Sequence, residues 1–202
     1  MVSTSGSQLL DKEAVGLLSK RLLPLATVVT PNLPEAKLLL ETEGIPFKDP
    51  ECVDDIVQMA KAIQHFGPKY VLLKGGHLPL TRDRLVSKQE ADNDIVLNVL
   101  CGEGEIVLME TDFLESKNTH GTGCSLACEF RPLFPCGLYT NMISIPPLAA
   151  IASNLALGVN MVNAVKNANK YVEAGIKSSI SLGKGFGPIN HFHSTYTLPF
   201  AP

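Results

Sequence analysis

The sequence predicts an α/β fold in which helices cover both faces of a mainly parallel sheet. Three observations carry this prediction: helical periods alternate with short strands, the strands are almost wholly apolar, and turns rich in glycine and proline separate them. A strand that is apolar on both faces must meet a helix on each side, as in a three-layer α/β/α sandwich. The chain has 202 residues, of which 45% are hydrophobic, so we expect one compact unit with a sizeable core.

The alternation begins near the start of the chain. Residues 10–23 carry apolar side chains at helical spacing and predict an amphipathic helix that Asp11 caps and Pro24 ends. The β-branched run 26–30 predicts a short strand, and Pro34 suits the first turn of the helix that follows. The sequence therefore predicts a strand, a tight turn and a helix in succession.

Further strands and helices follow along the chain. Residues 54–65 repeat the helical period, and the apolar run 70–73 after them predicts a buried strand. Residues 95–100 and 105–109 predict two strands, which a glycine-containing turn joins as an antiparallel hairpin at one end of the sheet. A last helix is predicted over residues 161–178.

Composition and charge argue against several classes of function. The net charge is -3, from 17 basic and 20 acidic residues without a long run of either sign, which argues against nucleic-acid binding. No stretch is apolar for long enough to span a membrane, and the first residues do not resemble a secretory signal, so we expect a soluble, cytoplasmic protein. The five cysteines do not show the spacing of a zinc site, so we expect reduced thiols.

The most informative segment is residues 117–124, KNTHGTGC, which follows an apolar strand and leads into a helix start. Gly121 and Gly123 allow the backbone to approach a ligand closely, and the free amides of a helix N-terminus favour a phosphate or a developing negative charge. Spacing alone leaves an ordinary glycine turn equally open. The segment is not a P-loop, because the GxxxxGK[ST] arrangement is absent from it.

Four motifs, in order, resemble those of the hydroxymethylpyrimidine and phosphomethylpyrimidine kinases of thiamine biosynthesis, a family of the ribokinase superfamily. They are residues 30–36 (TPNLPEA), 73–77 (LKGGH), 118–124 (NTHGTGC) and 185–191 (GFGPINH). The resemblance implies a ribokinase-like α/β/α sandwich. It also implies transfer of the γ-phosphate of ATP to the hydroxymethyl group of the pyrimidine, and then to the resulting monophosphate.

The resemblance implies that Gly121, Thr122, Gly123 and Cys124 are catalytic. Phosphoryl transfer needs positioning and electrostatic stabilisation more than covalent help, and the amides of this turn are suited to supply it. By its match to the family motif, Cys124 would face the substrate hydroxyl as general base, and a helix N-terminus can lower the pKa of such a thiol. The alternative is a cysteine that only packs.

The resemblance also implies sites for ATP and Mg²⁺. The residues expected to bind ATP are Lys74, Asn32, Thr119, Gly121 and Gly123. Lys74 follows a buried strand and would emerge at its carboxyl end, where open α/β sheets bind ligands. Asn32 and Glu35 lie at a helix start, where a carboxylate can hold magnesium near phosphates. The alternative for Asn32 and Glu35 is capping and solvation of that helix.

The sequence departs from the family pattern in two places. Relatives have an N-terminal part with most of the pyrimidine pocket, so we expect residues 1–196 to form the C-terminal portion of a kinase domain that is incomplete at the N-terminus. Residues 128–148 place four prolines where the family continues a helix. We interpret them as an insertion from a translated intron or a gene-model error, and a genuine surface loop is the alternative.

Residues 197–202 are typical of a linker or tail, and in some fungal relatives a domain resembling thiaminase II follows the kinase. The partners that the resemblance implies are a small pyrimidine, ATP and a second copy in a homodimer. Two other functions stay open. One is a different ribokinase-type kinase, such as a pyridoxal kinase, which usually carries aspartate where this chain has Cys124. The other is an inactive fragment that binds only the nucleotide.

Overall fold

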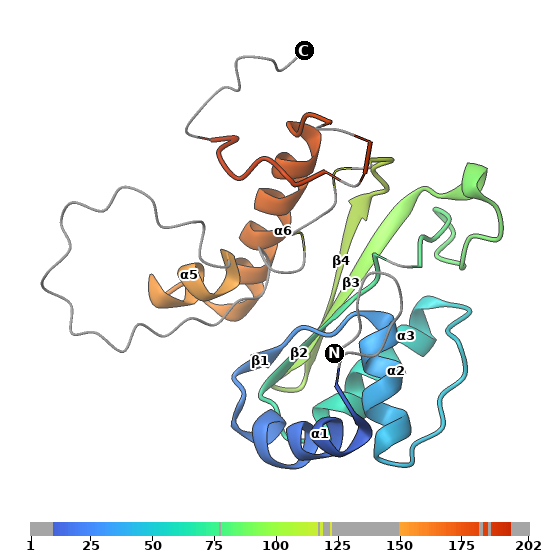
Figure 1. The fold of residues 1–202 in the computed structure, drawn as a ribbon, viewed down its shortest axis with the longest axis vertical. Coiled ribbons are helices and arrows are strands. Elements are labelled where there is room, and N and C mark those ends of the chain that lie inside the picture. Colours follow the sequence, from blue (N-terminus) through green and yellow to red (C-terminus); the bar gives the residue numbers. More distant parts are fainter. Residues whose placement is uncertain are drawn as a thin grey trace, which may run out of the picture. The chain divides into compact units, whose positions relative to one another are not determined.

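The structure is a computed structural model that describes residues 10–76, 78–116, 118, 122, 150–181, 184–185 and 187–194. The chain divides into two compact units, Met1–Phe113 and Leu114–Pro202. Figure 1 shows the helices and strands of both. Among the described residues, no helix combines the length and the apolar character that crossing a membrane requires.

The first unit contains helices α1 to α3 and strands β1 to β4, and the second contains α5 and α6. The elements of the first unit are α1 (Lys12–Leu17), the π-helical turn η1 (Leu18–Leu22), the 3₁₀ turn η2 (Leu23–Leu25), β1 (Val28–Val29), α2 (Leu33–Thr42), α3 (Val53–Gln64), β2 (Tyr70–Lys74), the 3₁₀ turn η3 (Glu90–Asp92), β3 (Ile95–Gly102) and β4 (Glu105–Asp112). Those of the second unit are α5 (Ala150–Ala156) and α6 (Met161–Lys177).

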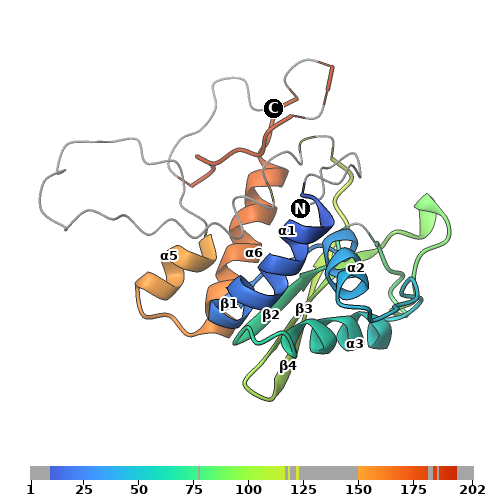
Figure 2. The ribbon, with the colours of Figure 1, turned by 60° about the horizontal axis from the view of Figure 1, so that its bottom comes forward.

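The predicted first helix, residues 10–23, is divided in the structure. Asp11 caps α1 as expected, since its Oδ1 accepts a hydrogen bond from the amide of Ala14 at 2.7 Å. The α-helical hydrogen bonding ends at Leu17, and the chain continues as the turns η1 and η2. Pro24 lies within the 3₁₀ turn η2, and the backbone becomes extended at Ala26, two residues after the predicted stop. Helix α1 lies beside α2 (Figure 2).

The sheet of the first unit has the order β1-β2-β3-β4. Strands β1 and β2 are parallel, whereas β2 with β3 and β3 with β4 are antiparallel. The described sheet is therefore mixed, with one parallel pairing. Residues 75–94 connect β2 to β3 through a 3₁₀ turn instead of an α-helix, so β3 returns in the opposite direction. The predicted hairpin is confirmed, and its turn places both Glu103 and Gly104 at positive φ, as in a two-residue hairpin turn.

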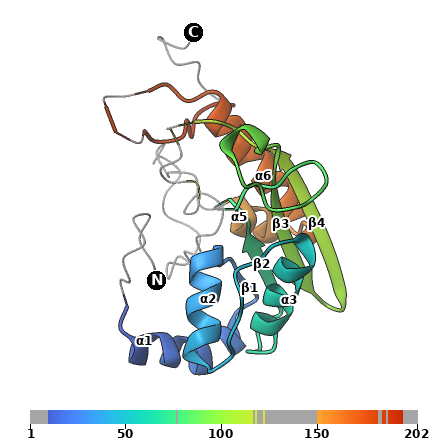
Figure 3. The same cartoon turned by 90° about the vertical axis from the view of Figure 1, so that its right-hand side faces the viewer.

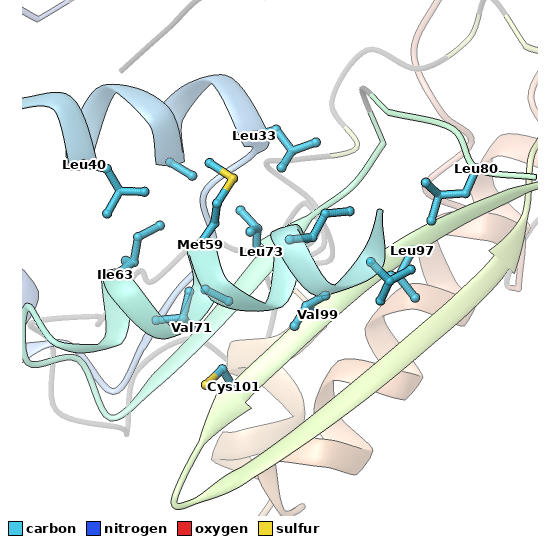
Figure 4. Packing of buried hydrophobic residues seen from close by; sticks show 14 residues of the cluster. Leu33, Leu40, Met59, Ile63, Val71, Leu73, Leu80, Leu97, Val99 and Cys101 are labelled. Atoms are coloured by element: carbon cyan, nitrogen blue, oxygen red, sulfur yellow. The ribbon is translucent and has the colours of Figure 1, made fainter. Parts of the chain in front are cut away.

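The core of the first unit lies between one face of the sheet and helices α2 and α3, which lie side by side (Figure 3). Val71 and Leu73 of β2 and Val99 of β3 point to this face and are fully buried. They meet Leu40 of α2 and Ile63 of α3 (Figure 4). Leu72 leaves the opposite face of β2 and is buried as well, so this strand is buried on both faces, as the apolar run 70–73 predicts.

The second unit is built around α6, which confirms the helix predicted over residues 161–178. Asn160 caps it, with its Oδ1 accepting from the amide of Asn163 at 2.9 Å. The last described segment, residues 187–194, packs on the final turns of α6: the amide of Asn190 donates to the carbonyl oxygen of Gly175 at 2.9 Å. Ile189 of this segment is buried.

Candidate functional site

Asn32 and Glu35 form a reciprocal cap at the start of α2. The amide of Glu35 donates to Asn32 Oδ1 at 2.8 Å, and the amide of Asn32 donates to Glu35 Oε2 at 3.1 Å. This is a capping box, and it satisfies two amides at the helix N-terminus that have no partner within the helix. Both residues therefore cap α2, and their role in metal binding stays a prediction.

Lys74 is the last residue of β2, as expected, and its side chain is half-buried. Its amide donates to the carbonyl oxygen of Pro31 at 2.9 Å, and Lys74 forms a parallel bridge with Asn32. Since β1 and β2 are parallel, their carboxyl ends meet at one edge of the sheet. The structure thus brings Asn32, Glu35 and Lys74 together where β2 ends and α2 begins.

Directly after Lys74, the backbone at Gly75 runs close to strand β3. A Cβ added to Gly75 would overlap the carbonyl oxygen of Leu97, so only glycine fits directly after Lys74. The amide of Gly75 donates to Asn98 Oδ1 at 3.1 Å. Asn98 stands within an ordinary strand pattern, so the sequence carries no signal that marks it, and only the register of β3 brings it next to Lys74.

The chemistry of these side chains fits a magnesium–phosphate site. Magnesium takes oxygen ligands and is held by one or two carboxylates together with substrate phosphates and water. Glu35 supplies one carboxylate at this edge and Asn32 one amide oxygen, and both are already ordered by the capping box. No cluster of three or more His, Cys, Asp or Glu side chains able to hold a metal occurs within the part of the chain that the structure describes.

Only two residues of the motif at 118–124 are described, Asn118 and Thr122. Thr122 is half-buried. Asn118 is 5% exposed, and its amide donates to Ser116 Oγ at 3.1 Å. The predicted residues Thr119, Gly121, Gly123 and Cys124 lie outside the described residues.

The motif at 185–191 is held against Asn118 and α6. The Oδ1 atom of Asn118 is buried without a hydrogen-bond partner among the described residues, and it occupies the position that a Cβ on Gly187 would take. Tyr171 of α6 donates a hydrogen bond to the carbonyl oxygen of His191 at 2.9 Å, and its ring lies 4.8 Å from that of His193. Two causes lower the pKa of His191: burial is the larger, and the neighbouring His193 is the smaller. The neutral form of His191 is therefore favoured.

The chain resembles proteins of one family over most of its length. The family model described as phosphomethylpyrimidine kinase matches residues 1–130 and 148–190. A hydroxymethylpyrimidine/phosphomethylpyrimidine kinase of Haemophilus influenzae is 35% identical over 194 residues, which are 95% of this chain and 58% of the relative. A bifunctional thiamine biosynthesis protein of Geobacter sulfurreducens is 34% identical over 191 residues, 95% of this chain and 31% of that protein.

Among solved structures, the ADP complex of a pyridoxal kinase from Bacillus subtilis matches with a TM-score of 0.69 and 28% identity. The match covers 96% of this chain and 58% of that enzyme, and it confirms the predicted ribokinase-like α/β fold. This chain therefore spans less than two thirds of the length of these relatives.

Proposed function

The chain belongs to the phosphomethylpyrimidine kinase family, and from this we propose that it is part of an ATP-dependent kinase of thiamine biosynthesis. The proposed reaction transfers the γ-phosphate of ATP to 4-amino-5-hydroxymethyl-2-methylpyrimidine, and then a second phosphate to the monophosphate. The family match supports the reaction class, and the relative of H. influenzae supports the substrate. Because the chain spans 58% of that relative, the activity of the whole protein is itself a proposal.

The observation that carries this proposal is the edge formed by Asn32, Glu35 and Lys74. The N-terminus of α2 and the ammonium of Lys74 are both attractive to anions, and they occur together at the carboxyl end of β2. We assign Lys74 and Asn32 to the phosphates of ATP. Glu35 and Asn32 would hold Mg²⁺, which neutralises charge on those phosphates when it is bound.

For the transfer step, we assign the roles that the resemblance implies to Gly121, Thr122, Gly123 and Cys124. Cys124, as thiolate, takes the proton of the substrate hydroxyl. The hydroxyl oxygen then forms a bond to the γ-phosphorus, and the bond from that phosphorus to the bridging oxygen of ADP breaks. The amides of residues 121–124 stabilise the charge on the phosphoryl oxygens, and Thr119 contributes to nucleotide binding.

A second candidate function is that of a pyridoxal kinase, and the likeness to the B. subtilis structure favours it. The two kinases differ in the alcohol that they phosphorylate, so a panel of both alcohols with ATP separates them. A third candidate is a chain that binds nucleotide without turnover. We also propose a cytoplasmic protein that forms homodimers, and fusion to a second enzyme occurs among relatives, as the bifunctional protein of G. sulfurreducens shows.

Isothermal titration calorimetry tests the proposal. ATP with Mg²⁺ should bind the chain, and Lys74→Met should weaken this binding by about tenfold, the effect of one charge-assisted hydrogen bond of ~1.4 kcal/mol. Hydroxymethylpyrimidine is titrated separately. Binding of ATP without binding of the pyrimidine indicates a nucleotide-binding fragment, and the absence of both contradicts the proposed function.

Turnover is then measured with the chain alone and with Cys124→Ala. Loss of a general base lowers kcat by roughly 10²- to 10⁴-fold. A Cys124→Ala variant that keeps the full rate rejects the base role while leaving the kinase assignment intact. Lys20→Met, a change of the same type on an exposed lysine of η1, is the matched control for Lys74→Met.

A further inference from the structure

Lys74 and Asn98 are direct neighbours across the antiparallel ladder of β2 and β3. Residues that pair in this way extend their side chains from the same face of a sheet. The buried residues Leu73 and Leu97, one position away on each strand, belong to the core under α2 and α3. Lys74 and Asn98 therefore share the opposite face of the sheet.

The backbone around Lys74 is held from two sides. The amide of Lys74 donates to the carbonyl oxygen of Pro31, at 2.9 Å, in the segment that precedes α2. The next amide, that of Gly75, donates to Asn98 Oδ1 of β3 at 3.1 Å. At Gly75 the chain also passes so close to the carbonyl oxygen of Leu97 that a Cβ would not fit. Asn98 thus provides the acceptor that fixes the chain where it leaves β2.

We propose that Asn98 is a positioning residue for nucleotide binding, which acts by fixing the backbone from which the side chain of Lys74 extends. This inference rests on the proposed role of Lys74 at the phosphates of ATP. A lysine side chain is long and flexible, so the place of its ammonium depends on a backbone that does not move. A side chain that anchors the neighbouring amide therefore contributes to affinity without touching the ligand.

The test compares ATP–Mg²⁺ affinity among three variants by calorimetry. Asn98→Leu keeps the approximate size of the side chain and removes the acceptor, and it should weaken binding about tenfold. Asn98→Gln keeps a neutral amide oxygen as acceptor for the Gly75 amide, without placing a carboxylate beside Lys74, and should bind within about threefold of the unaltered chain. Thr111→Val is the matched control, because it removes a 3.5 Å side-chain hydrogen bond to the carbonyl oxygen of Val96 in the adjacent ladder of β3 and β4, and its affinity should not change.

A double-mutant cycle shows whether Asn98 acts through Lys74. If it does, Asn98→Leu changes affinity by less than twofold when Lys74→Met is already present, because coupled residues are not additive. Equal effects of Asn98→Leu in the two backgrounds overturn the proposal. So does an affinity of Asn98→Leu equal to that of the unaltered chain.

Amide hydrogen exchange measured by NMR gives a readout that does not need a nucleotide. In Asn98→Leu the Gly75 amide should exchange about fivefold faster, the effect of one lost hydrogen bond of ~1 kcal/mol, while the buried Leu72 amide keeps its rate. If the unaltered chain does not bind ATP but the Gly75 amide responds as expected, the proposed function fails and the anchoring contact stands. If the amide does not respond, the inference itself is rejected.

Discussion

At the scale of single residues, Gly187 shows how a motif glycine is required by packing. The buried Oδ1 of Asn118 lies where the Cβ of any other residue would be, whereas a Cβ on Gly185, two positions earlier, would have no atom of the described residues within 4 Å. The two glycines belong to the same sequence motif, yet of the two only Gly187 lies in close contact with Asn118. Their substitution by alanine therefore separates a steric requirement from a general preference for glycine in a loop.

We expect Gly187→Ala to lower the free energy of unfolding by about 1–3 kcal/mol, the usual cost of overpacking a close contact. Gly185→Ala should change it by no more than about 0.5 kcal/mol. Urea denaturation of both variants measures the difference. Adding Asn118→Ala to Gly187→Ala should restore part of the loss, since it removes the atom that the new methyl group meets. Equal stability of the two alanine variants would show that the contact has no cost.

Tyr70 provides a residue-scale prediction about pH. Its hydroxyl donates a hydrogen bond to Glu103, whose carboxylate is also paired with Lys69 at 2.7 Å. The hydrogen bond to Glu103 is the main cause that raises the pKa of Tyr70 from 10.0 to about 12, and burial is the second cause. Because the pKa of Tyr70 is raised in the folded state, its hydrogen bond to Glu103 stabilises the fold fully below pH 10. This contribution to the free energy of unfolding is lost as the pH rises through about 12.

Glu103→Gln should bring the pKa of Tyr70 back toward its ordinary value, because the carboxylate that favours the protonated phenol is gone. Ultraviolet absorbance of the phenolate during an alkaline titration follows this change. Tyr70→Phe identifies which transition belongs to Tyr70, which is needed because burial also raises the pKa of Tyr171. A titration of Glu103→Gln that coincides with that of the unaltered chain argues against the hydrogen bond as the cause.

At the scale of elements, the predictions that depend on nearby residues are confirmed. The last helix, the hairpin of β3 and β4 and the buried strand β2 occur where the sequence places them. The first helix is the exception, since its α-helical part ends at Leu17 although the apolar spacing continues to residue 23. Apolar spacing does not distinguish α-helical from π-helical or 3₁₀ turns. In this segment it does not mark the buried face either, because Leu17 and Leu22 are exposed whereas Val15 is buried.

Residues 128–148 carry an element-scale prediction, although they lie outside the described residues. We propose that they are an insertion that the fold does not require. The family model matches the chain up to residue 130 and again from residue 148, which supports this proposal. Four prolines in the segment are also incompatible with the continuous helix of the family pattern.

A chain in which residues 131–147 are deleted should unfold at the same temperature as the unaltered chain or a higher one. It should also bind ATP–Mg²⁺ at least as tightly, because the family pattern is continuous across the new junction. Differential scanning calorimetry and titration calorimetry measure the two properties. Loss of cooperative unfolding on deletion would identify the segment as part of the fold, and sequencing of the transcript across it would show whether it is spliced.

At the scale of the whole molecule, the described chain has the ribokinase-like α/β fold that the resemblance implied. Its sheet is nevertheless mixed, since the chain returns from β2 to β3 without a helical crossover. Residues of the motifs occur in both compact units. Asn32 and Lys74 lie in the first unit, and Asn118 and Gly187 lie in the second. A chain that spans 58% of its H. influenzae relative thus contains the four motifs on which the resemblance rests.

The α/β class and the family can be predicted from the amino-acid sequence, because helical periods, apolar strands, glycine turns and short motifs are local patterns. The capping box of Asn32 and Glu35 is also a local pattern, since its two residues lie three apart, but the resemblance favoured a magnesium role and left capping as the alternative. Two contacts, in contrast, are visible only in the folded chain. Asn98 accepts a hydrogen bond from the amide of Gly75, and Asn118 occupies the space beside Gly187. Both contacts join segments more than twenty residues apart, and strand register and loop packing, which set them, depend on the whole fold.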